Sequence, residues 1–186
     1  MKNFKLIMII VACANIFAAC KKDKTEPTEL SKLPAATQTG ANTFGCLVNG
    51  KAYVAQNDCK YLCNSPFKVS YNSDFGGIVG ITGDWLNSKE NIDKRIQILI
   101  DSTNHKLMHS ISIYNPHQGA GYIDSKLTTC NQYDHYLDSA STHTGNVILT
   151  KYDLQNGIIS GTFNFTLIKP GCVTITVTEG RFDKKL

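Results

Sequence analysis

The sequence predicts an all-β protein, an antiparallel β-sandwich or flattened barrel, that follows a signal peptide and a disordered tether. Three observations predict this fold. Apolar and polar residues alternate in short runs between residues 43 and 178, as they do in strands with one buried face. Asn49-Gly50 separates two such runs, and this pair favours the positive φ angles of a tight hairpin turn. No stretch longer than about two turns repeats its apolar residues with the helical period.

The expected strands can be justified in chain order. Two runs flank the Asn-Gly turn, and the run at 95–101 places Ile96, Ile98 and Ile100 on one face. Phe182 departs from the alternation that precedes it, so we expect a bulge at Gly180. A short helical turn is expected at 90–95. The predicted strands are 43–48, 51–56, 67–72, 77–83, 95–101, 109–115, 145–153, 157–168 and 173–178.

The first twenty residues predict a lipoprotein signal. A short basic segment precedes an apolar run at 6–19, and Cys20 follows two alanines. The run is shorter than the roughly 20 residues of a spanning helix, so residues 1–19 are interpreted as a cleaved signal peptide. The small residues before Cys20 resemble a bacterial lipobox, in which the cysteine sulfur receives a diacylglycerol. Cys13, after Ile10-Val11-Ala12, is the alternative lipidation site, and a plain secretory signal with a chance cysteine is another alternative.

Residues 20–42 predict a lipidated, flexible tether, because they are rich in Lys, Thr, Glu and Pro and lack an apolar period. The folded domain is then 43–186. Lys21-Lys22-Asp23 resembles the export signal of Bacteroidetes surface lipoproteins, which implies an outer-membrane protein displayed on the cell exterior. Acyl chains contribute about 0.8 kcal/mol per buried methylene, so the membrane is an expected partner through the lipid anchor.

Length, composition and charge narrow the function classes. The chain has 186 residues, 42% of them hydrophobic and 18% charged, which excludes a disordered protein. Removal of the signal peptide takes two of the 19 Lys and Arg residues and leaves 17 against 15 acidic ones, a charge of +2. That charge is too small for a nucleic-acid footprint, and no nucleic-acid partner is expected.

Three segments, at 33–54, 148–166 and 170–183, resemble a family of uncharacterised Bacteroidetes lipoproteins that carry a domain of unknown function. The family has Leu-Pro-Pro where this chain has Leu33-Pro34-Ala35, and the middle, about 57–145, matches poorly. The resemblance implies a lipid-anchored, extracytoplasmic β domain and implies no activity.

Five cysteines remain after the signal, so at least one thiol is unpaired or bonded between chains. We expect a Cys46–Cys172 disulfide, because both lie in the segments that carry the resemblance. Cys59 and Cys63 are expected to form a second, local disulfide, so Cys130 would remain without a partner in the chain. Connectivity cannot be read from sequence, so other pairings stay open.

No catalytic residue, cofactor or metal site is expected. The sequence has no GxSxG, HExxH or phosphate-binding glycine motif, and Cys59-x3-Cys63 lacks a second pair at zinc-ligand spacing. The alternative function is a hydrolase of cell-surface glycans or other polymers, which needs converging carboxylates; Asp84, Asp134 and Asp138 are its candidates. A small-molecule carrier with a deep apolar cavity is a third possibility.

The segment 114–144 is rich in tyrosine and histidine and predicts a contact surface for a glycan or a surface protein. The candidate binding residues are Tyr114, Tyr122, Tyr133 and Tyr136, with Trp85 as a further contact aromatic. The alternative is that these rings pack across an edge strand or in the core. The leading hypothesis is therefore a non-enzymatic binding or structural module.

Overall fold

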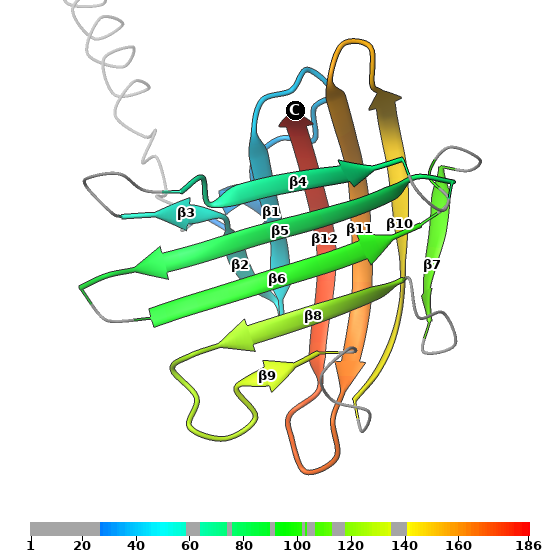
Figure 1. Ribbon diagram of the computed structural model, residues 1–186. Coiled ribbons are helices and arrows are strands. Elements are labelled where there is room, and N and C mark those ends of the chain that lie inside the picture. Colours follow the sequence, from blue (N-terminus) through cyan, green and yellow to red (C-terminus); the bar gives the residue numbers. More distant parts are fainter. Residues whose placement is uncertain are drawn as a thin grey trace, which may run out of the picture.

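The computed structural model describes residues 27–58, 64–73, 76–89, 92–101, 103, 107–112, 118–134 and 141–186. Two β-sheets pack face to face, and the strands of one cross those of the other at a steep angle (Figure 1). The described residues contain no α-helix, and a 3-10 turn spans Leu30–Lys32. The all-β prediction is confirmed, and the sheets form a sandwich rather than a closed barrel.

The first sheet has the strand order β2-β1-β12-β11-β10-β7, and its neighbouring strands are antiparallel. Asn49 and Gly50 join β1 to β2 with φ angles of 47° and 78°, which confirms the predicted tight turn. The strands are β1 (Thr43–Val48), β2 (Lys51–Val54), β7 (Met108–Ser112), β10 (Thr142–Asp153), β11 (Ile158–Ile168) and β12 (Ile175–Lys185).

The second sheet has the order β3-β5-β6-β8-β9, and β4 also pairs with β5. β3 runs parallel to β5, whereas the other pairs are antiparallel. The strands are β3 (Gln56–Asn57), β4 (Phe67–Asn72), β5 (Ile78–Asn87), β6 (Ile92–Ile100), β8 (Gly119–Asp124) and β9 (Gln132–Tyr133).

The pairing registers test the finer predictions. Around Glu179, β12 has one more residue than the facing stretch of β1 and of β11. Glu179 itself has a φ of 55°. The predicted bulge beside Gly180 is thus confirmed. The helical turn expected at 90–95 is wrong, because β6 already begins at Ile92. β8 and β9, which the sequence analysis did not predict as strands, lie within 114–144.

Aromatic rings from both sheets form the centre of the core. Phe44 of β1 lies with its ring centroid 5.6 Å from that of Phe67 in β4 and 5.3 Å from that of Phe163 in β11. Gly83 of β5 leaves room for this ring, since a Cβ atom there would stand 2.4 Å from Phe44. Close packing of this kind fixes the separation of the two sheets on this side of the sandwich.

The segment 27–42 is part of the folded domain, and its prediction as a mobile tether is wrong. Leu33 is buried, and the Glu29 carboxylate accepts a hydrogen bond of 2.7 Å from the Ala52 N–H in β2. The Pro34 ring packs against Gly45 of β1. The folded domain therefore includes residues from Glu29 onward, well ahead of the predicted boundary at residue 43.

A buried carboxylate in β12 holds the same segment in place. Asp183 is 1% exposed and accepts hydrogen bonds from Thr37 Oγ1 (2.6 Å), Thr39 N (3.0 Å), Gly40 N (2.8 Å), Ala41 N (3.0 Å) and Ser160 Oγ (2.7 Å). Burial alone would raise the pKa of Asp183, but the hydrogen bonds outweigh it and lower the pKa well below its ordinary value.

Asp183→Asn should therefore destabilise the domain by about 2–4 kcal/mol at neutral pH, because an amide cannot accept all these hydrogen bonds. Urea unfolding measures the loss. Since folding lowers the pKa, the carboxylate stabilises the fold above the unfolded value of about 3.9, and this contribution disappears as the pH falls below it.

The stability of Asp183→Asn should accordingly depend less on pH between about 4 and 2 than that of the unmodified chain. Glu179→Gln is the matched control on the same strand, because its side chain is 54% exposed and bonds only Arg181. Equal losses in the two variants would contradict this role of Asp183.

Candidate functional site

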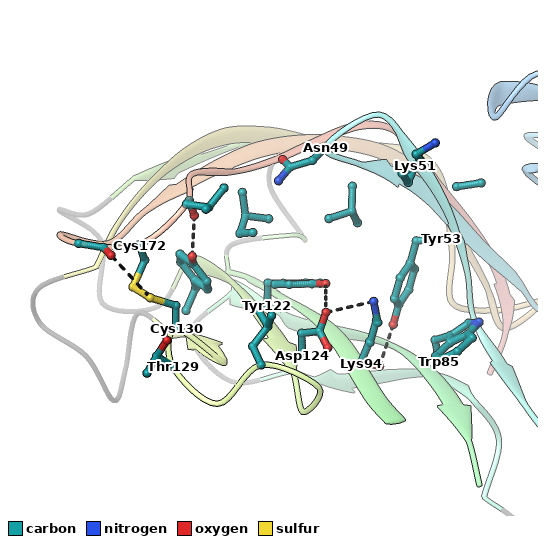
Figure 2. A pocket seen from close by; sticks show the side chains of 17 residues that line it. Asn49, Lys51, Tyr53, Trp85, Lys94, Tyr122, Asp124, Thr129, Cys130 and Cys172 are labelled. Atoms are coloured by element: carbon teal, nitrogen blue, oxygen red, sulfur yellow. Dashed lines mark hydrogen bonds and ion pairs between the residues drawn. A yellow bond between two sulfur atoms is a disulfide. The ribbon is translucent and has the colours of Figure 1, made fainter. Parts of the chain in front are cut away.

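A cleft with a volume of about 740 Å³ lies between the two sheets (Figure 2). The first sheet contributes the β1–β2 hairpin and the start of β12, and the second contributes residues of β5, β6, β8 and β9. Twisted sheets that cross steeply diverge toward a corner of the sandwich, which leaves this space. The volume falls within the roughly 300–1,000 Å³ that is usual for small-molecule sites.

Tyr53 closes one side of the cleft. Its side chain extends from β2 in the first sheet, and its hydroxyl lies 2.7 Å from the Gly83 carbonyl and 3.0 Å from the Lys94 carbonyl, both in the second sheet. Burial raises the pKa of Tyr53 far above its ordinary value, so the hydroxyl keeps the proton that it donates. The two sheets are thereby bonded to each other beside the cleft.

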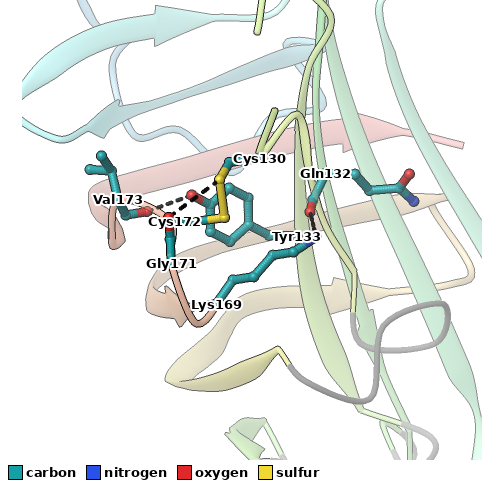
Figure 3. Close-up of a disulfide and its surroundings, with 7 residues drawn as sticks. All are labelled: Cys130, Gln132, Tyr133, Lys169, Gly171, Cys172 and Val173. Atoms are coloured by element: carbon teal, nitrogen blue, oxygen red, sulfur yellow. Dashed lines mark hydrogen bonds between the residues drawn. A yellow bond between two sulfur atoms is a disulfide. The ribbon is translucent and has the colours of Figure 1, made fainter. Parts of the chain in front are cut away.

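A disulfide closes the opposite side (Figure 3). Cys130, in the β8–β9 connection, bonds to Cys172, in the β11–β12 connection, across a sequence separation of 42. Beside it, the Tyr133 hydroxyl donates a 2.5 Å hydrogen bond to the Val173 carbonyl. The Lys169 ammonium donates to the Gln132 carbonyl at 3.1 Å. These contacts join a loop of each sheet to the other at this end.

The predicted Cys46–Cys172 disulfide is wrong. Cys46 is a free cysteine in the middle of β1 with no exposed surface, whereas Cys172 lies in a loop at the end of the sandwich. Burial raises the pKa of the Cys46 thiol, so it stays protonated and unreactive in the folded protein. Cys59 and Cys63 of the predicted local pair lie outside the described residues, as does the predicted lipidation site, Cys20.

Three of the five predicted binding residues meet at the cleft: Trp85, Tyr122 and Tyr133. Tyr122 and Tyr133 are cross-strand partners in β8 and β9, with ring centroids 6.5 Å apart. They are only 5% and 1% exposed, so they do not form a surface patch on a loop. The two rings instead pack against each other at the edge strand β9, as the alternative prediction stated. Tyr114 and Tyr136 lie outside the described residues.

A charged pair that the sequence analysis missed lies on the wall formed by the second sheet. Lys94 Nζ is 3.0 Å from Asp124 Oδ2, and the Tyr122 hydroxyl donates to the same oxygen at 3.2 Å. Lys94 Nζ also stands 5.9 Å from the centroid of the Trp85 ring. The signal was present in the alternation, since Lys94 shares the parity of Ile96, Ile98 and Ile100 and had to face inward.

The carboxylates proposed for hydrolysis do not converge among the described residues. Asp84 is buried and bonded to Arg95 at 2.6 Å, and it does not line the cleft. Asp134 lines a separate cavity of about 210 Å³ on the second sheet, and Asp138 lies outside the described residues. Asp124 is the only described acidic residue in the larger cleft. The described part of the chain also brings together no group of three or more metal-ligating side chains.

No family model, curated protein or solved structure matches this chain. The resemblance to Bacteroidetes lipoproteins therefore stays a prediction. Among the residues that the structure describes, no helix has the length and apolar character needed to cross a membrane.

Removal of the disulfide by Cys130→Ala with Cys172→Ala should lower the stability by about 4 kcal/mol, because the bond closes a long loop in the unfolded chain. Urea unfolding without reductant measures this loss. Reductant should bring the unmodified chain down to the level of the double variant. Any change that reductant causes in the stability of the double variant measures the contribution of other disulfides. Recovery of Cys130 or Cys172 as a free thiol, or bonded to Cys46, would contradict the pairing.

Proposed function

We propose that this chain is a lipid-anchored binding module of the bacterial outer membrane, displayed at the cell surface, and that the cleft between its sheets holds the ligand. The observation that carries the proposal is the cleft itself. Trp85 of β5 and the cross-strand pair Tyr122 and Tyr133 of β8 and β9 line one cavity of about 740 Å³. Aromatic side chains that converge in a concave site of this size are typical of ligand recognition.

The energetics of the cleft favour an occupant. Protein interiors are normally close-packed, yet here apolar walls stand apart because Tyr53 and the Cys130–Cys172 disulfide join the sheets on either side. A ligand that covers these walls gains roughly 25 cal/mol for each Å² of apolar surface removed from water. Since the walls are already held apart, binding requires little ordering of the protein.

Binding without catalysis is the simpler function for these residues. Asp124, the acidic residue described in the cleft, is paired with Lys94 and accepts a further bond from Tyr122. A hydrolase needs a second carboxylate about 5–10 Å away, and no described lining residue supplies it. The hydrolase alternative therefore has no observation in its favour.

The anchor places the module close to a membrane. Glu29 bonds to β2, so in the proposed lipoprotein the link from the lipidated Cys20 to this contact is nine residues long. Fully extended, at about 3.5 Å per residue, this link spans at most about 30 Å. In the proposed lipoprotein the domain would thus remain within that distance of the lipid surface.

Binding in the cleft can be tested with a neutral apolar dye such as Nile red, since Trp85 is the chain's only tryptophan and reports on the cleft. The dye should quench Trp85 by energy transfer. Val48→Phe, which enlarges an inward-facing side chain of the cleft wall, should weaken dye binding about tenfold or more. Ser110→Phe, exposed on β7 at the far edge of the first sheet, should not. Equal affinity in both variants would place the dye elsewhere and count against the proposal.

Lipidation can be tested by growing cells on a traceable fatty acid. The chain should incorporate the label and sediment with the outer membrane, and Cys20→Ser should abolish both, because the thioether needs the cysteine sulfur. Cys13→Ser is the matched control and should retain the label. Label that is lost in Cys13→Ser but kept in Cys20→Ser would show that Cys13 is the lipidated residue. Absence of label from the unmodified chain would contradict lipidation.

A further inference from the structure

The polar groups of the cleft are unequally available to a ligand. The hydroxyls of Tyr53, Tyr122 and Tyr133 all contact acceptors within the protein. The Asn49 side chain donates to the Thr174 carbonyl and accepts from the Thr176 N–H. A neutral sugar needs many donors and acceptors at fixed positions, and it would have to break these internal bonds to gain its own.

The rest of the wall is mainly apolar. The aromatic rings line the interior, and Leu127 and Val173, which are 42% and 73% exposed, lie at the end of the cleft near the disulfide. Ile175 and Val48 extend this surface along the first sheet. Exposed apolar side chains beside a cavity suit the apolar body of a ligand.

One cation in this wall has unused hydrogen-bonding capacity. The Lys94 ammonium can donate three hydrogen bonds, and among the described residues Asp124 is its ion-pair partner. The Asp124 carboxylate is more fully engaged, since Oδ2 faces Lys94 and Tyr122 and Oδ1 accepts from the Lys126 N–H at 3.1 Å. A cationic ligand would have to displace Lys94 to reach it. An anion can bind Lys94 without displacing any group.

Lys51 is a useful contrast. It lies at the rim of the cleft on β2, and its nitrogen points away from the cavity, whereas Lys94 lies beside Asp124 on the opposite wall (Figure 2). The two lysines carry the same charge, but only Lys94 is placed to contact the head group of a ligand inside.

We propose that the cleft binds an amphipathic carboxylate, whose charged head pairs with Lys94 and whose apolar body lies against Trp85 and the exposed apolar side chains of the wall. This inference rests on the proposed binding function and names the ligand class of the same cleft. A charge-assisted hydrogen bond in a partly desolvated site is stronger than one between neutral groups, so the head group decides which amphiphile binds.

The test compares ligands that share a chain or a head. Decanoate, decyl maltoside, decyltrimethylammonium and maltose are titrated below micelle-forming concentrations, and Trp85 emission reports binding. Decanoate should bind about tenfold or more tightly than the neutral and cationic decyl compounds. Maltose, which lacks an apolar body, should leave the emission unchanged.

Variants then locate the head group. Asp124→Asn keeps the shape of the side chain and removes its competing charge, so decanoate affinity should rise by about three- to tenfold. Lys94→Met should lower it about tenfold, while Lys51→Met, the matched loss of one charge, should change it less than about twofold.

A second variant guards against misfolding, because Lys94→Met alone leaves the Asp124 charge without its partner. Lys94→Met with Asp124→Asn removes both charges and should bind decanoate no better than decyl maltoside. Thermal unfolding establishes that each variant is folded.

The outcomes separate the two proposals. The carboxylate inference would be overturned if decyl maltoside or maltose bound as tightly as decanoate. It would also be overturned if neither Asp124→Asn nor Lys94→Met changed the affinity for decanoate. In both cases the proposed binding cleft would stand. Two results together would overturn both proposals: no response of Trp85 to any ligand, and equal binding of the neutral dye by the unmodified chain and Val48→Phe.

Discussion

The separation of the two sheets at one corner of the sandwich is the constraint on which the cleft depends. The Phe44 cluster fixes the sheets on the side where their core is closely packed. At the open corner the Tyr53 hydroxyl bonds the second sheet from one side, and the Cys130–Cys172 disulfide joins the connecting loops on the other. The Tyr53 side chain and the disulfide thus span the gap between the sheets on either side of the cleft, and the cavity lies between these two connections.

The sequence predicted most strands because a half-buried strand repeats its apolar residues with a period of two, and that period is local. The Asn49-Gly50 turn and the bulge beside Gly180 were predictable for the same reason, since backbone conformation there follows from neighbouring residues. The segment 27–42 has no such period. Its order comes largely from hydrogen bonds to Asp183, more than 140 residues away along the chain, and composition carries no information about a partner at that distance.

The cleft was partly predictable. Tyrosines in 114–144 and Trp85 indicated recognition by residue type, but only the pairing of β8 with β6 and β9 brings Tyr122 near Lys94 and Tyr133. The disulfide was mispredicted because similarity to a family identifies segments and gives no distance between cysteines. The second sheet places Cys130 opposite Cys172, while Cys46 lies inside β1. The alternation in β6 predicts that Lys94 faces inward. Its pairing with Asp124 depends on the register between β6 and β8.

The Lys94–Asp124 pair has a consequence for how such a cleft would be used. A lone lysine facing apolar walls would lose hydration without compensation, so the neighbouring carboxylate stabilises the empty cleft. The same carboxylate repels an anionic head group and divides the positive charge of Lys94 between two partners. Affinity for an amphipathic anion is therefore lower than the apolar walls and the lysine alone would give. In the proposed binding module, Asp124 would thus weaken the hold of Lys94 on the ligand and favour its release.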